Sequence, residues 1–100
     1  MRIRFAAEAF ADLDGHIEYY GQRSIQAKQT FLVQLDQILQ LVDHHPEIAP
    51  RVQGDVRRFT MRNYTVAIYY SIETAEDIVV VGILHLRRNP EIIDERLENQ

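Results

Sequence analysis

Six basic side chains fall in the second half of the chain, close to short segments with the composition of β-strands. They are Arg57, Arg58, Arg62, His85, Arg87 and Arg88. Arginine binds carboxylates and phosphates through charge-assisted hydrogen bonds, and histidine can also transfer protons near neutral pH. We therefore expect these six residues to bind a partner. Ion pairs with Asp55 or with the acids near the C-terminus are the alternative, but few acids lie close in sequence.

The chain as a whole is acidic, with 11 lysines and arginines against 15 aspartates and glutamates and a net charge of -4. This balance argues against the uniform positive field of nonspecific nucleic-acid binders, and we expect no direct sequence-specific binding of nucleic acid by the chain alone. Between Arg51 and Tyr70, however, four arginines face one acid, Asp55. A basic region on an acidic chain predicts a particular partner.

Several other chemistries are disfavoured by the sequence. The absence of cysteine removes disulfides and thiol catalysis and fits a reducing compartment. The longest apolar run, Ile78 to Leu84, is too short to span a bilayer, and the N-terminus has no signal-peptide core. We expect a cytoplasmic protein without membrane contact.

Histidines and tyrosines offer two further candidate sites. His44 and His45, with His16 or His85, suggest a metal site, but adjacent residues rarely point at one ion, and we expect no metal and no cofactor. The tyrosine pairs Tyr19-Tyr20 and Tyr69-Tyr70 suggest base stacking, yet aromatic residues at helix and strand spacings are more often core, and we interpret them as packing.

The first half of the chain predicts a helical hairpin. From about Glu8 to Gln22, apolar residues recur at spacings of three and four, and Ser24 can cap a second helix that ends near His44. The two apolar stripes are Phe10, Leu13, Ile17 and Tyr20 in the first helix, and Ala27, Phe31, Leu35, Ile38 and Val42 in the second. Residues 2 to 5 alternate as in a short strand.

The second half predicts an antiparallel meander. Pro46, Pro50 and Gly54 indicate a loop over residues 44 to 55. Strands are expected at 57–61, 64–72 and 78–86, with a tight turn at Arg62-Asn63. The last two strands are apolar on both faces, which indicates a sheet covered twice.

A short helix is expected after Asn89, which can serve as its cap. The predicted class is α+β: a short N-terminal strand and a helical hairpin packed on a three- to four-stranded, mainly antiparallel sheet, with a short C-terminal helix, as one domain over residues 1–100. Because this last helix is small, we expect another chain to cover part of the second face.

These elements resemble the RelE/ParE superfamily of toxins from type II toxin–antitoxin modules, and its ParE branch in particular. The resemblance rests on order and spacing over nearly the whole chain, in Ala9, Asp12, Leu13, Ile17, Tyr20, Pro46, Val56 to Phe59, Tyr64, Tyr69, Tyr70, and the closing Ile83-Leu84-His85-x-Arg87-Arg88-x-Pro90. It implies a toxin that is neutralised by a cognate, ParD-like antitoxin covering the sheet.

The resemblance also bears on the activity. In the ribonuclease pattern of RelE, an arginine follows the strand tyrosine and a tyrosine lies six residues beyond the second arginine; here these places are Thr65 and Ile93, and only Arg87 matches. Threonine cannot neutralise a phosphate, and isoleucine cannot transfer a proton. The ParE branch implies inhibition of DNA gyrase by binding, with no catalytic residue.

Two alternatives stay open. One is a ribosome-dependent endoribonuclease of the RelE type that uses His85, Arg58 and Arg87 in a rearranged site, although a histidine at a strand end is more often a hydrogen-bonded structural residue. The other is a degenerate toxin that binds its antitoxin and has no target.

Overall fold

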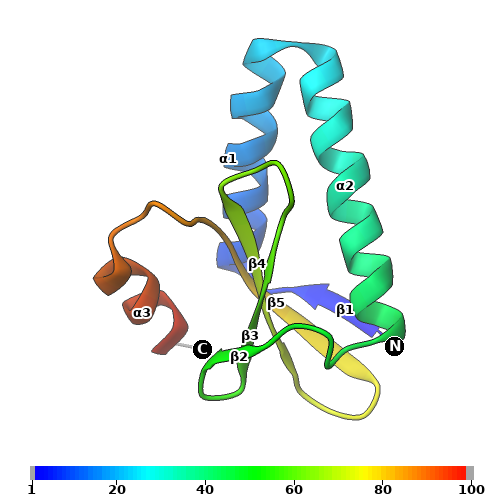
Figure 1. Cartoon of the computed structure of the whole chain (residues 1–100), viewed down its shortest axis with the longest axis vertical. Coiled ribbons are helices and arrows are strands. Elements are labelled where there is room, and N and C mark those ends of the chain that lie inside the picture. Colours follow the sequence, from blue (N-terminus) through cyan, green and yellow to red (C-terminus); the bar gives the residue numbers. More distant parts are fainter. Residues whose placement is uncertain (1, 99–100) are drawn as a thin grey trace.

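A computed structural model describes residues 2–98 of the chain. The elements are, in order, β1 (Arg2–Phe5), α1 (Ala7–Arg23), α2 (Ile25–His44), β2 (Arg51–Gln53), β3 (Val56–Thr60), β4 (Val66–Ile72), β5 (Asp77–His85) and α3 (Pro90–Glu98). The strands form one sheet in the order β1-β5-β4-β3-β2. β1 is parallel to β5, and the other neighbours are antiparallel. Figure 1 shows the hairpin of α1 and α2 rising from the sheet and α3 lying apart from it. The α+β prediction is confirmed.

The strand count differs from the prediction of three to four. The additional strand is β2, which lies inside the segment expected to be a loop and pairs with β3 through an irregular register. Pro46 and Pro50 precede this strand, so they do not interrupt its pairing, and Gly54 turns the chain into β3 with a positive φ of 53°. The short sequence of β2 carries no strand signal of its own, which is why the loop prediction was wrong here.

Local capping sets the helix ends where the sequence places them. The Ser24 side chain accepts a hydrogen bond from the Ala27 N–H at 2.9 Å, and Asn89 accepts one from the Glu91 N–H at 2.9 Å. Asn63 adopts the left-handed conformation with φ of 70°. The turn around Asn63 is longer than the predicted two residues, because Met61 and Val66 close it with a backbone hydrogen bond of 2.9 Å.

One hydrophobic core lies between the helical hairpin and the sheet. α2 supplies Phe31, Leu35 and Val42 to it, as its apolar stripe predicts. Phe31 is fully buried and stacks on Tyr20 with ring centroids 4.8 Å apart. The stripe of α1 is buried less completely, since Phe10 is 54% exposed and stacks on Phe5 of β1. This core fixes the hairpin on one face of the sheet.

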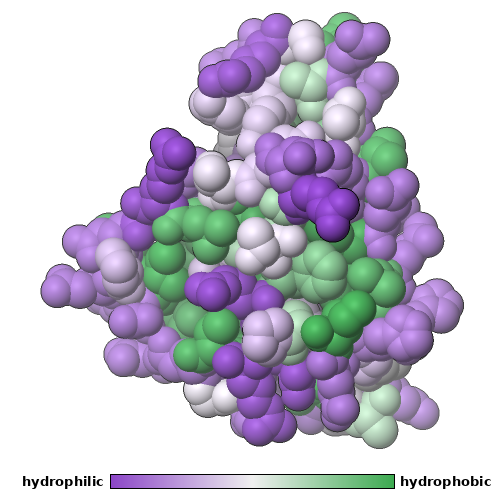
Figure 2. All heavy atoms as spheres, in the orientation of Figure 1, coloured by the Kyte–Doolittle hydropathy of each residue, from purple (hydrophilic) through white to green (hydrophobic). Residues whose placement is uncertain are grey.

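A second core covers the opposite face, as the two-sided apolar pattern of the last two strands predicts. Its buried residues include Tyr69, Val81, Leu84 and Leu97, with Ile93 packed against them. Figure 2 shows hydrophobic side chains gathered in the middle of one face of the molecule, over the sheet and beside α3. α3 covers part of this face through Leu97 and Ile93, and the expectation that another chain covers part of it stays a prediction.

Replacement of Phe31 by alanine tests the first core. Phe31→Ala should lower the free energy of unfolding by about 3–5 kcal/mol, because it leaves a cavity under Tyr20 and the sheet. Urea denaturation of the purified protein measures this change. Val33→Ala is the matched control on the same helix, where the side chain is 56% exposed and a change within about 0.5 kcal/mol is expected. Equal effects of the two substitutions would contradict the packing described here.

Candidate functional site

The edge of β5 is covered by a strand along only part of its length. β1 pairs with Asp77 to Val80, and α1 begins directly after β1. Beyond that point side chains take over the hydrogen bonding, which unpaired edge groups require when buried. The Ile83 N–H donates to Asp12 Oδ2 at 3.0 Å, and the Ile83 carbonyl accepts from His16 Nε2 at 2.8 Å. α1 is thereby attached along the second half of β5.

The Asp12 carboxylate also binds Arg96 of α3. The two guanidinium contacts are 3.0 Å from Nη1 to Oδ2 and 2.8 Å from Nη2 to Oδ1, and Arg96 Nε lies 2.7 Å from Glu8 Oε2. The side chains of Arg96 and Asp12 are 17% and 11% exposed, so solvent screens this pair only weakly. The hydrogen bond to Asp12 raises the pKa of Arg96 despite its partial burial. The pair holds α3 against α1.

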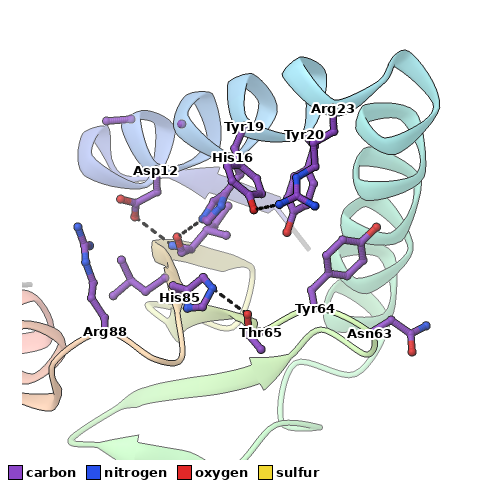
Figure 3. Close-up of a pocket in the computed structure, with 14 residues that line it drawn as sticks. Asp12, His16, Tyr19, Tyr20, Arg23, Asn63, Tyr64, Thr65, His85 and Arg88 are labelled. Carbon is purple, nitrogen blue, oxygen red and sulfur yellow. Dashed lines mark hydrogen bonds between the residues drawn. The ribbon is translucent and has the colours of Figure 1, made fainter.

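An open cleft of about 970 Å³ lies between α1 and the ends of β4 and β5. We call it the tyrosine cleft and define it by Tyr19, Tyr20, Tyr64, Thr65, His85 and Arg88. Figure 3 shows α1 along one side of this cleft, Arg88 at one end, Tyr64 at the other, and His85 between them. The cleft brings aromatic, hydroxyl and basic groups together.

The aromatic residues of the cleft have different surroundings. Tyr20 packs on Phe31 and meets Tyr64 edge-on at 5.4 Å, and its burial raises its pKa. Tyr19 is instead 49% exposed, with the Arg23 guanidinium 4.6 Å above its ring and also hydrogen-bonded to its hydroxyl. The packing interpretation holds for Tyr20, Tyr69 and Tyr70, but Tyr19 is a surface residue.

His85 and Thr65 form a small hydrogen-bond network on the floor of the cleft. The Arg87 backbone N–H donates to His85 Nδ1 at 3.2 Å, so that nitrogen is the acceptor. In the neutral ring the proton therefore sits on Nε2, which lies 2.8 Å from Thr65 Oγ1 and donates to it. Because the Thr65 oxygen already accepts this hydrogen bond, the Thr65 hydroxyl can donate its own proton to another acceptor. His85 is thus held in one tautomer.

A second, smaller hollow of about 230 Å³ lies beside α3. We call it the α3 groove and define it by Val52, Arg58, Tyr69, Leu86, Arg88 and Asp94. The Tyr69 side chain is buried, and its hydroxyl has no hydrogen-bond partner among residues 2–98. A buried phenol without a partner costs about 1–3 kcal/mol. A bound group that accepts from this hydroxyl or donates to it would recover part of that cost.

The six basic residues predicted from the sequence do not form one patch. Arg57 donates to the carbonyls of Ala49 at 2.7 Å and Glu47 at 3.2 Å, so it holds the loop before β2 and is half-buried. This loop is also bound by the Tyr70 hydroxyl, which donates to the Pro46 carbonyl at 2.7 Å. Arg57 thus has a structural role in holding this loop, and its partner-binding role stays a prediction.

The other basic residues are exposed but divided among several surfaces. Arg58 lines the α3 groove, His85 the tyrosine cleft, and Arg88 both. Arg62 lies at the turn between β3 and β4 and faces α2, and Arg87 lines neither hollow. Within residues 2–98 the side chains of Arg58, Arg62, Arg87 and Arg88 have no ion-pair partner. The proposed ribonuclease set of His85, Arg58 and Arg87 shares no single hollow.

Sequence reasoning missed Arg96 and the exposed stripe of α1. Arg96 and Asp12 are far apart in the chain, so no local pattern joins them. The stripe consists of Ala11, Gly15, Tyr19 and Arg23, which repeat every four residues and are all exposed. This spacing is visible in the sequence, but small and polar residues at helical spacing do not by themselves indicate a binding surface.

The described part of the chain holds no group of three side chains suited to a metal ion. His44 uses Nδ1 to donate to the Gln40 carbonyl at 2.8 Å, as a histidine at a helix end commonly does. Among residues 2–98 no helix has both the length and the apolar character needed to cross a membrane.

Comparison with solved structures agrees with this fold. The chain is similar to a protein described as the chromosomal ParDE TA system from P. aeruginosa, with a TM-score of 0.59 and 18% sequence identity over 85% of this chain and 95% of that one. This likeness defines the class as a ParE-like toxin fold. The family model for the ParE toxin of the type II toxin–antitoxin system parDE matches residues 3–90. The chain therefore belongs to the ParE toxin family. No curated protein sequence matches it.

Loss of the Asp12 carboxylate should weaken the attachment of both α1 and α3. Asp12→Asn is expected to lower the free energy of unfolding by about 3 kcal/mol, because Arg96 is left without its main partner in a partly buried place. Hydrogen exchange should show the loss of protection first in α3. Glu8→Gln is the control, since the Glu8 side chain is 59% exposed and its loss should cost less than about 1 kcal/mol. Unchanged exchange in α3 would contradict this assignment.

Proposed function

We propose that this ParE-family toxin inhibits DNA gyrase by binding it, and that a ParD-like antitoxin neutralises it in the cytoplasm. The family match is the observation that carries the proposal. Gyrase as the target follows from the resemblance to the ParE branch, and binding requires only a shaped and charged surface.

The surroundings of two residues support binding over RNA cleavage. Thr65 and Ile93 occupy the places of the arginine and tyrosine in the RelE pattern. Thr65 is hydrogen-bonded to His85, and Ile93 packs into the second core. Neither side chain can neutralise a phosphate or transfer a proton, and His85 Nδ1 is occupied by the Arg87 N–H.

The exposed arginines without ion-pair partners are the best candidates for contact with the target. Arg62, Arg87 and Arg88 lie at turns that follow β3 and β5, where side chains are accessible. An arginine in such a place can bind a carboxylate of a partner with two parallel hydrogen bonds. We assign the contact with gyrase to this end of the sheet.

The α3 groove suits the antitoxin. It combines apolar walls with Arg58, Arg88 and the buried Tyr69 hydroxyl, and this combination fits an amphipathic segment with an acidic side chain. The groove lies on the second face of the sheet, where the sequence also predicts antitoxin contact.

Charge reversal at the end of β5 tests the proposed target. Expression of the toxin without antitoxin should arrest growth, and purified toxin should block supercoiling by gyrase. The double substitution Arg87→Glu and Arg88→Glu should raise the toxin concentration needed for half inhibition at least about tenfold, because like charges would then repel. Arg4→Glu, an exposed arginine on β1, is the control and should leave inhibition unchanged.

Normal supercoiling at saturating toxin would count against gyrase as the target. Transcript ends mapped after induction would then separate the alternatives. New cuts within ribosome-bound codons that disappear with His85→Ala would favour the RelE-like endoribonuclease. An absence of both growth arrest and cleavage would favour a degenerate toxin.

A single charge change in the α3 groove tests the antitoxin surface. Arg58→Glu should weaken binding of the cognate antitoxin about tenfold or more, since it places a carboxylate where we expect an acidic partner group. Isothermal titration calorimetry with the antitoxin encoded beside the toxin measures this. Lys28→Glu, on α2 outside the groove, is the control. Antitoxin affinity that responds to Lys28 and not to Arg58 would place the antitoxin on the helical hairpin instead.

A further inference from the structure

We propose that the tyrosine cleft binds one phosphorylated nucleotide unit, with the base against Tyr19 and Arg23 and the phosphate near Arg88. Its volume of about 970 Å³ is in the usual range for small-molecule sites. The proposal is independent of gyrase binding.

Tyr19, together with the Arg23 guanidinium that covers its ring, is the stacking surface available to a base. Half of Tyr19 is exposed, whereas Tyr20 is occupied by contacts with Phe31 and Tyr64. Stacking on a tyrosine ring requires only a flat aromatic partner, which every base provides. Arg23 already lies over the Tyr19 ring, and a guanidinium plane can stack on a base as well. Tyr19 and Arg23 thus form a stacking wall on α1.

The opposite side of the cleft offers donors for a phosphate. His85 donates to Thr65 Oγ1, so the Thr65 hydroxyl proton is left for another acceptor. Arg88 lies at the end of the cleft, exposed and without an ion-pair partner within residues 2–98. An exposed guanidinium without an ion-pair partner is a common contact for a phosphate.

The electrostatic setting favours an anion in this place although the whole chain is acidic. The one carboxylate that lines the cleft in the described residues is Asp12, and it is already bound by Arg96 and by the Ile83 N–H. Arg23 and Arg88 therefore set the local charge. The net charge of -4 limits the site to a single unit and argues against a long polyanion track.

A mid-helix glycine leaves room for the ligand. Gly15 lies one turn before Tyr19 on the exposed stripe of α1, and a Cβ at this position would meet nothing within 4 Å. Glycine inside a helix costs about 1 kcal/mol relative to alanine, and no packing contact at this position offsets that cost. The open space that Gly15 leaves beside Tyr19 can accommodate a bound base.

The test measures binding to the purified toxin through NMR chemical-shift changes. The probes are AMP, adenosine and inorganic phosphate. AMP should bind more tightly than either adenosine or phosphate alone, because it engages both sides of the cleft. Tyr19→Ser and Arg88→Gln should each weaken AMP binding about tenfold or more. Phe10→Ser, an exposed aromatic on the same helix, and Arg4→Gln are matched controls that should leave it unchanged.

Gly15→Leu separates ligand geometry from folding. Leucine is a better helix former than glycine, and its side chain would fill the open space beside Tyr19. This variant should therefore bind AMP about tenfold more weakly without a loss of stability to urea. A further arm compares AMP with a five-nucleotide single strand of adenylate. If this oligonucleotide binds more tightly than AMP, the site binds a nucleotide within a polymer. If it binds equally or more weakly, the site binds a free nucleotide.

The proposal is overturned if AMP causes no shifts in the cleft, if phosphate alone binds as tightly as AMP, or if Gly15→Leu and Tyr19→Ser bind like the wild type. Such results would leave the cleft to a protein partner. They would say nothing against gyrase inhibition, which is measured separately.

Discussion

The Asp12 carboxylate connects three elements of this toxin. β1 covers only the first part of the β5 edge, so the second part needs other hydrogen-bond partners if α1 is to pack against it. Asp12 supplies one by accepting from the Ile83 N–H, and the same carboxylate binds Arg96 of α3. The positions of α1 and α3, and therefore the walls of both the tyrosine cleft and the α3 groove, depend on this side chain.

The parts of the fold that local chemistry determines could be predicted from the sequence. Ser24, Asn63 and Asn89 act on backbone groups a few residues away, so their caps and turn were found. The burial of Phe31 follows from helical periodicity. β2 could not be found this way, because its pairing with β3 depends on which distant segments meet.

The site was predicted less well, for two different reasons. Arg57 and Arg58 are adjacent on a strand, and successive side chains point to opposite faces of a sheet, so these two residues cannot share one surface. The pairing of Asp12 with Arg96 joins residues 84 positions apart, and no pattern in a single sequence reveals it. Tyr19 was assigned to the core with its neighbour Tyr20, although the two rings are in contact and only Tyr19 is exposed.

Arg88 lines both the tyrosine cleft and the α3 groove. A guanidinium that pairs closely with an anion directs its donors at that anion and is no longer free for a second one. A phosphate in the cleft and an acidic antitoxin group in the groove would therefore compete for the same side chain, even though the rest of the two surfaces is separate. By linkage, each ligand would then lower the affinity for the other by the same factor. With the antitoxin in the α3 groove as proposed, the shared arginine would let it affect the cleft without covering it.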